Sequence, residues 1–130
     1  MEVTDAESFA TASGATPQQV ADLTVYRDLL AAWNEHMNLV GPATIETFWS
    51  RHAWDSAQLK PLAPEARTWA DLGTGAGLPG VVLAILGRDD GTHVHLVESM
   101  AKRCRFLSEV VTQLKLPATV QHDRAENLQL

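Results

Sequence analysis

The chain has 130 residues, of which 45% are hydrophobic, and a formal net charge of −6 at pH 7, which suits one compact domain with its own core. It contains no run of about eighteen apolar residues and no basic start followed by an apolar stretch, so we expect neither a membrane span nor a signal peptide, but a cytoplasmic protein. The single cysteine, Cys104, excludes an internal disulfide and a cysteine-rich metal site.

Residues 1–15 are small, polar and acidic and show no apolar periodicity, which predicts a mobile tail. The next residues predict a helix start, with Thr16 as the capping residue, Pro17 at the first helical position and Gln19 placed to complete a capping box. Apolar residues then recur at helical spacing as far as Met37, so we expect one buried helical stripe.

Gly41-Pro42 interrupts this helix, and a second helix is predicted over residues 44–59, capped by its first residue, a threonine. It contains Arg51-His52, Asp55 and Ser56, residue types that also make up hydrolytic triads. Residues at such spacing on one helix stand side by side, without the strained turn that presents a nucleophile. We therefore expect a polar helix face, with the arginine–histidine pair bordering a ligand groove.

A short apolar strand is predicted over residues 68–72, and the chain then passes through a glycine-rich turn into a helix that ends near Gly87. The glycines of the turn are Gly73, Gly75 and Gly77. Glycine allows positive φ and lets a ligand approach the main chain where a Cβ would block it. Free N–H groups in the turn and at the helix start favour acceptor-rich ligands such as carboxylates or phosphates.

Two acids flank this turn at the ends of neighbouring predicted strands. Asp71 precedes the first glycine, where a carboxylate can meet a cationic ligand group, and Glu98 ends the apolar run over 94–97, where dinucleotide folds place an acid on ribose hydroxyls. The spacing Gly75-x-Gly77-x-x-Gly80 also matches the dinucleotide fingerprint. An acid at each of two strand ends suits a nucleoside that carries an amino acid better than a pyrophosphate.

The next helix is predicted to have Ser99 as its cap, and it carries Lys102, Arg103 and Arg105 in its first turns. The helix dipole disfavours positive charge there, which indicates an external anion such as RNA phosphate; a solvated basic face is the alternative. The negative net charge does not exclude RNA, because six of the 16 acids lie in residues 1–35.

A third strand is predicted over residues 118–122, after Pro117 stops the helix. Strand–helix–strand–helix–strand with right-handed crossovers gives a parallel sheet that binds ligand at the carboxyl ends of its strands. His93 and His95 alternate on the second strand, but two histidines alone are a poor metal site, so no metal is expected.

Taken in order, these residues resemble the bacterial small-subunit (16S) rRNA guanine-N7 methyltransferases known as RsmG or glucose-inhibited division protein B. The resemblance runs from about Leu30 to Glu126, and the glycine–leucine–proline–glycine form of the turn is its most specific mark. The motifs that carry it are Trp33-Asn34 with Asn38-Leu39, Arg51-His52 with Asp55-Ser56, the run from Asp71 to Gly80, Lys102-Arg103 with Phe106-Leu107, and Arg124-Ala125-Glu126.

The resemblance implies a Rossmann-like α/β methyltransferase fold with S-adenosylmethionine as cofactor and 16S rRNA or the small ribosomal subunit as partner. It implies cofactor contacts at Asp71, Gly73, Gly75, Gly77, Leu78, Glu98, Ala125 and Glu126, beside the RNA contacts expected at the three basic residues. No catalytic residue is assigned, because guanine N7 carries a lone pair and no proton. Methyl transfer to N7 requires alignment of nucleophile, methyl and leaving sulfur more than a general base.

The family's sheet has seven strands and only three are found here, so the chain is expected to be the amino-terminal part of such an enzyme. We expect one domain, with the tail over 1–15, a helical part over 16–66 and the first half of the α/β core over 67–130. The first strand is then an open sheet edge, and the chain alone a poor catalyst. A non-catalytic module that binds a nucleotide or S-adenosylmethionine is the alternative; a dinucleotide oxidoreductase is disfavoured by Asp71 and by the two preceding helices.

Overall fold

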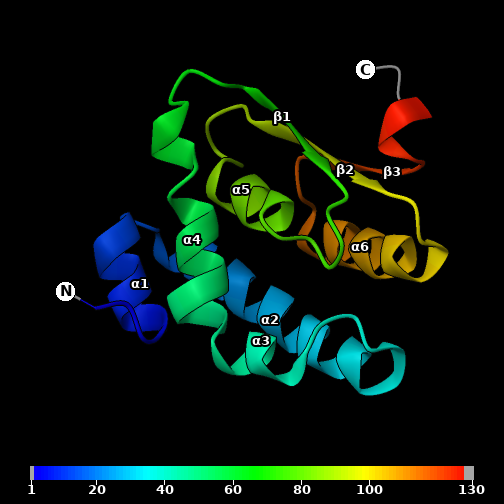
Figure 1. Ribbon diagram of the computed structural model, residues 1–130. Coiled ribbons are helices and arrows are strands. Elements are labelled where there is room, and N and C mark those ends of the chain that lie inside the picture. Colours follow the sequence, from blue (N-terminus) through cyan, green and yellow to red (C-terminus); the bar gives the residue numbers. More distant parts are fainter. Residues whose placement is uncertain (1, 128–130) are drawn as a thin grey trace.

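A layer of helices packs against one face of a small parallel sheet (Figure 1). The computed structural model describes residues 2–127. Its helices are α1 (Ala6–Ser13), α2 (Pro17–Met37), α3 (Pro42–Glu46), α4 (Trp54–Ala57), α5 (Gly80–Leu86) and α6 (Ala101–Leu114), and its strands are β1 (Thr68–Leu72), β2 (His93–Glu98) and β3 (Ala118–His122). A π-helical turn (Phe48–Ala53) precedes α4, and short 3-10 turns follow at Lys60–Leu62 and Ala125–Asn127.

The three strands are all parallel and lie in the order β1-β2-β3. Asp71 is aligned with Leu96 on β2, and Val97 is aligned with Gln121 on β3. The crossover helices α5 and α6 contact the same face of the sheet, as two successive right-handed crossovers in one direction require. The predicted fold, an incomplete Rossmann-like parallel sheet preceded by helices, is confirmed.

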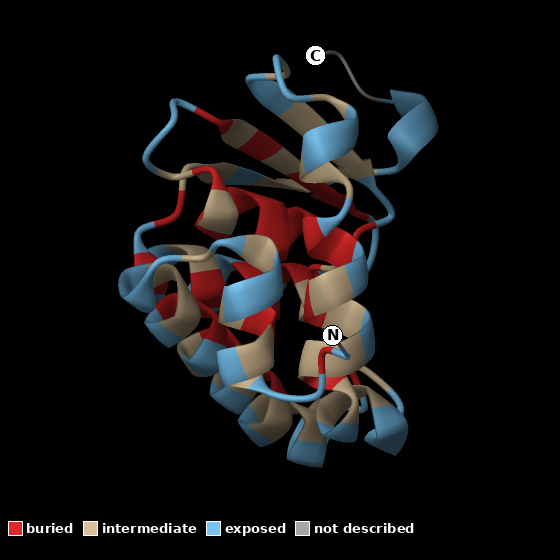
Figure 2. Cartoon of the chain, turned by 90° about the vertical axis from the view of Figure 1, so that its left-hand side faces the viewer, coloured by how far each residue is buried: buried red, intermediate tan, exposed pale blue. Residues whose placement is uncertain are grey.

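The hydrophobic core lies between the sheet and the N-terminal helices, where Figure 2 shows the buried residues gathered. Its centre is aromatic: the ring of Tyr26 on α2 lies 5.7 Å from that of Phe48 and 6.4 Å from that of Phe106 on α6. All three side chains are fully buried, and burying each apolar side chain of this size contributes about 1.5–3 kcal/mol. The N-terminal helices and the sheet therefore share one core.

The capping box of α2 forms as predicted. The Gln19 N–H donates to Thr16 Oγ1 at 3.2 Å, and the Thr16 N–H donates to Gln19 Oε1 at 3.0 Å, so two N–H groups at the helix start are satisfied. The helix ends at Met37, and Asn38 follows with a φ of 48°. Among residues 2–127, no helix combines the length and the apolar character needed to cross a membrane.

The prediction of a mobile tail over 1–15 is wrong for α1. Asp5 caps this helix, since its Oδ1 accepts from the Ser8 N–H at 2.9 Å. Phe9 is fully buried, with its ring centroid 5.5 Å from that of Trp49 and 6.4 Å from that of Trp54. A single buried side chain gives a short helix no apolar periodicity, and the partners of Phe9 come from a distant part of the sequence.

The prediction of one helix over 44–59 is also wrong. Helix α3 begins at Pro42 with Gly41 as its N-cap, because proline fits the first helical position. The backbone then widens into the π-helical turn and narrows again in α4. The sequence shows no proline or glycine between 43 and 59 that would mark these changes.

The outer face of the sheet and the free edge of β1 are uncovered in the described part of the chain. β1 pairs with β2 alone, and its outward residues Thr68, Ala70 and Leu72 are exposed, with 56% of Leu72 accessible. An open edge with unpaired backbone groups beside an apolar side chain favours pairing with another chain.

We expect the chain to self-associate through this edge, and Leu72→Lys to weaken the association because a lysine on an edge strand opposes strand pairing. Leu62→Lys is the matched control, since Leu62 is 79% exposed and lies in a 3-10 turn outside the sheet. Sedimentation equilibrium at several concentrations measures the effect. Equal association of the two variants and the unchanged chain would contradict the prediction.

Candidate functional site

The glycine-rich loop of residues 73–79, called the glycine loop below, folds over the end of β2. The Val97 carbonyl accepts from both the Gly73 N–H at 2.9 Å and the Thr74 N–H at 3.0 Å. For one carbonyl to accept from two successive N–H groups, the chain must turn sharply after β1. Gly73 allows this turn because its φ is 71°, a backbone conformation that residues with a Cβ rarely adopt.

Glu98 fastens the glycine loop to the start of α6. Its Oε1 accepts from the Gly75 N–H and its Oε2 from the Met100 N–H, both at 2.9 Å. The residue is only 4% exposed, and Arg103 Nη1 lies 3.9 Å from Oε2, which offsets part of the cost of burying the charge. Met100, not the predicted Ser99, is the N-cap of α6, because the Glu98 carboxylate satisfies the amide at this helix start.

Asp71 fastens the loop to the start of α5. Its Oδ2 accepts from the Thr74 hydroxyl at 2.6 Å and from the Gly80 N–H at 2.9 Å. Burial raises the pKa of Asp71 and the nearby Glu98 charge adds to this rise, while the two hydrogen bonds oppose it. Both acids predicted to meet a ligand therefore also hold the loop in shape.

The glycines of the loop fall into two groups. A Cβ added at Gly73 or Gly75 would meet no other atom within 4 Å, and both have positive φ. A Cβ at Gly77 would lie 2.5 Å from Val81 Cγ2 and 3.0 Å from the Tyr26 hydroxyl oxygen. The first two leave open space along the main chain, whereas Gly77 permits close packing of the loop on the helices.

Tyr26 supports the loop from α2, and no sequence motif marked it. Its hydroxyl donates to the Ala76 carbonyl at 2.7 Å, in a fully buried position. Burial, with a smaller contribution from the Asp71 charge, raises the pKa of Tyr26 well above its ordinary value, so the donor proton is held. Only its place in an apolar stripe could have drawn attention to it.

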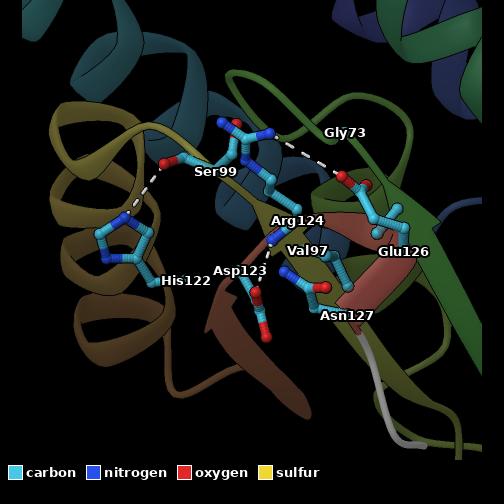
Figure 3. A pocket seen from close by; sticks show the side chains of 9 residues that line it. Gly73, Val97, Ser99, His122, Asp123, Arg124, Glu126 and Asn127 are labelled. Carbon is cyan, nitrogen blue, oxygen red and sulfur yellow. Dashed lines mark hydrogen bonds and ion pairs between the residues drawn. The ribbon is translucent and has the colours of Figure 1, made fainter.

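A cavity of about 630 Å³ opens beside the loop, at the carboxyl ends of β2 and β3 (Figure 3). Its volume lies in the range of small-molecule sites, roughly 300–1,000 Å³. Gly73, Ala125 and Glu126 of the predicted cofactor set line it, together with Val97, Ser99, His122, Asp123, Arg124 and Asn127. Asp71, Gly75, Gly77, Leu78 and Glu98 do not line it. Leu78 instead lines a separate cavity, together with Pro79 and residues of α4.

The three basic residues of α6 have different surroundings. Lys102 Nζ donates to the Met37 carbonyl at the end of α2, at 3.1 Å, and Arg103 lies beside Glu98. Arg105 is exposed, and its side chain has no polar partner within residues 2–127. Intramolecular contacts thus account for two of the positive charges at this helix start, and Arg105 is the one directed to solvent.

The Ser56 hydroxyl and the two histidines of β2 have hydrogen-bond partners within the fold. Ser56 is buried and its hydroxyl donates to the His52 carbonyl at 2.6 Å, which does not form a nucleophile and base pair. On the outer sheet face, His93 Nε2 lies 2.7 Å from Thr119 Oγ1 and His95 Nδ1 lies 3.0 Å from Gln121 Oε1. Across the described residues, no three His, Cys, Asp or Glu side chains are arranged to hold a metal ion.

Comparison with known proteins identifies close relatives. The family model described as rRNA small subunit methyltransferase G matches residues 19–130. A ribosomal RNA small subunit methyltransferase G of Caulobacter vibrioides is 64% identical over 130 residues, covering 98% of this chain and 60% of the relative. A relative of the same name from Methylobacterium radiotolerans is 50% identical over 115 residues, covering 88% and 54%. The chain therefore spans 60% and 54% of the length of these two relatives, and the prediction that it corresponds to a portion of such a protein is confirmed.

The raised pKa of Asp71 predicts a pH-dependent contribution to stability. The folded chain binds this proton more tightly than the unfolded chain, so the contribution of Asp71 is largest below its ordinary pKa and is lost as pH rises through the raised pKa. The amide side chain of the Asp71→Asn variant does not titrate. As the pH is lowered from 7 towards 4, the free energy of unfolding of the wild type should therefore rise relative to that of the variant. Urea unfolding of both proteins at several pH values measures this, and a constant or opposite difference would contradict it.

Proposed function

The chain belongs to the rRNA small subunit methyltransferase G family, and from this premise we propose that it binds S-adenosylmethionine and serves methylation of guanine N7 in small-subunit rRNA. The observation that carries the proposal is the glycine loop held open at Gly73 and Gly75 beside a cavity of about 630 Å³.

The residues present fit this cofactor. A Cβ at Gly73 or Gly75 would meet no other atom within 4 Å, so the main chain there is open to a ligand. Asp71 and Glu98 supply negative charge for a ligand that carries an amino group and ribose hydroxyls, and each carboxylate has lone pairs beyond those used by the loop amides. Ala125 and Glu126 border the cavity that would take the nucleoside end. We assign Gly77 and Leu78 to the same site as supports of the loop.

Methyl transfer to guanine N7 mainly requires that the nucleophile, the methyl group and the leaving sulfur lie in line. When bound, S-adenosylmethionine supplies an electrophilic methyl group on a sulfonium. The lone pair of guanine N7 would be the nucleophile, so no side chain of this chain would need to remove a proton, and rate enhancement would come from holding the reactants in line. The contribution of this chain is a rigid loop, fixed at both ends by Asp71 and Glu98.

The RNA partner is proposed from the family and from charge. Ribosomal RNA binds proteins largely through its phosphates, and the exposed Arg105 borders the same hollow as His122 at the carboxyl end of β3. We propose action in the cytoplasm on 16S rRNA or the small ribosomal subunit, because such a substrate is assembled there. Lys102 and Arg103 would add their positive charge to that of Arg105 at the start of α6 and so attract the RNA phosphates.

A second function, cofactor binding without efficient methyl transfer by this chain alone, is favoured by the free edge of β1. Strand β1 leads directly into the glycine loop, and on its far side no strand follows in the described residues. The substrate would then lack a binding surface on the far side of β1, whereas the cofactor contacts at the ends of β2 and β3 would remain.

Gly75→Val should weaken binding of S-adenosylhomocysteine by about tenfold or more, which corresponds to a loss of about 1.4 kcal/mol. The branched side chain occupies the open approach to the main chain. Gly91→Val is the matched control, because Gly91 also has positive φ and open space but lies in the turn before β2, at the opposite end of the strand. Isothermal titration measures both. Equal affinity in the two variants would refute the loop as the cofactor site.

Arg105→Gln should weaken binding of single-stranded RNA and reduce the slope of log K against log salt by about 0.7, as expected for one lost phosphate contact on a single strand. Arg67→Gln removes the same charge from an exposed residue at the start of β1, far from the loop, and should leave the slope unchanged. Fluorescence anisotropy at several salt concentrations measures both slopes. A larger effect from Arg67→Gln would argue against this assignment.

A further inference from the structure

A second cavity opens at the other end of the glycine loop. Its volume is about 350 Å³, and it lies where Leu78 and Pro79 meet the π-helical turn and α4. Arg51, His52 and Asp55 form its polar wall. The first cavity meets the loop at Gly73 instead, so the two cavities border different ends of one loop.

The second cavity lies towards the uncovered edge of the sheet. Helix α4 packs against α5, whereas α6 packs against β2 and β3, and Figure 1 shows α4 and α6 on opposite sides of α5. In-line methyl transfer requires the methyl acceptor and the leaving sulfur on opposite sides of the methyl group. If the cofactor uses the Gly73 end of the loop, the acceptor approaches from the Leu78–Pro79 end.

The backbone of this wall is unusual. Arg51 and His52 lie in the π-helical turn Phe48–Ala53, whose widened hydrogen bonding is rare and often occurs at functional sites. Within residues 2–127, the side chains of Arg51, His52 and Asp55 have no polar partner. Arg51 and Asp55 are exposed and His52 is half-buried. The polar wall of the second cavity thus consists of three side chains that have no polar partner in the described part of the chain.

These groups complement guanine and leave its N7 free. A carboxylate accepts from the guanine N1–H and N2–H₂ donors on the Watson–Crick edge, which lies away from N7. An arginine next to it binds an adjoining phosphate, and the side chains of Leu78 and Pro79 offer an apolar surface to the base. A volume of about 350 Å³ suits one base and lies near the lower limit of known sites, roughly 300 Å³.

We propose that this second cavity receives the guanine of a single-stranded RNA segment, with Asp55 reading its N1–H and N2–H₂ groups and Arg51 binding the backbone. The inference rests on the proposed function and adds the residues that face the RNA. It assigns a role to the Arg51-His52 and Asp55 motif that the cofactor site does not use.

The test is the preference of the full chain for guanine. Fluorescence anisotropy compares three labelled eight-nucleotide uridine-rich RNAs that carry one central guanosine, inosine or adenosine, with and without saturating S-adenosylhomocysteine. We expect the wild type to favour guanosine over adenosine by about tenfold, within the range for one bidentate base contact. Inosine, which lacks the 2-amino group, should bind with intermediate affinity. Asp55→Asn should abolish the preference, and Arg51→Gln should weaken all three RNAs equally.

Glu46→Gln is the matched control, because Glu46 is an exposed acid at the end of α3 that does not line the cavity. It should keep the guanosine preference, and circular dichroism should show equal thermal unfolding for all variants. A wild type without preference, or an Asp55→Asn variant that keeps it, would overturn the inference. Guanosine preference without binding of S-adenosylhomocysteine would refute the cofactor proposal and leave the base site standing.

Discussion

The buried carboxylate and carbonyl of Glu98 join the elements that meet at the ligand end of the sheet. The carboxylate accepts from Gly75 of the glycine loop and from Met100 at the start of α6. The carbonyl accepts from the Asp123 N–H, where the chain leaves β3, at 3.0 Å. It also accepts from Sγ of the buried Cys104 at 3.3 Å. Loss of this one carboxylate would leave the two amides that it binds without their acceptor.

The N-terminal helices give the loop a second support. Tyr26 of α2 fixes the Ala76 carbonyl, and the π-helical turn and α4 lie against Leu78 and Pro79. Lys102 ties the start of α6 to the end of α2 through the Met37 carbonyl. The helices ahead of the sheet thus support the glycine loop at Ala76 and at Leu78–Pro79. The sheet holds the loop at its other end, at Gly73 and Thr74.

The sequence predicted the structural features that depend on local residue patterns. The capping box at Thr16, the strand before Gly73, the strand before Glu98 and the buried stripe of α6 follow from spacing alone. It did not predict α1, because Phe9 is held by tryptophans far along the chain. It also did not predict that Asp71 and Glu98 bind backbone amides, because those partners come together only in the folded sheet.

We propose that the glycine loop and the turn after β3 bind one nucleoside ligand. The most direct measurement is a titration of the ¹⁵N-labelled chain with S-adenosylhomocysteine, followed by residue-resolved NMR. We expect concentration-dependent shifts of the Gly73, Gly75, Ala125 and Glu126 amides that saturate with one dissociation constant. Shifts confined to the cavity of about 560 Å³ between Gly14, Trp54 and Asp89, with these four amides unchanged, would contradict it.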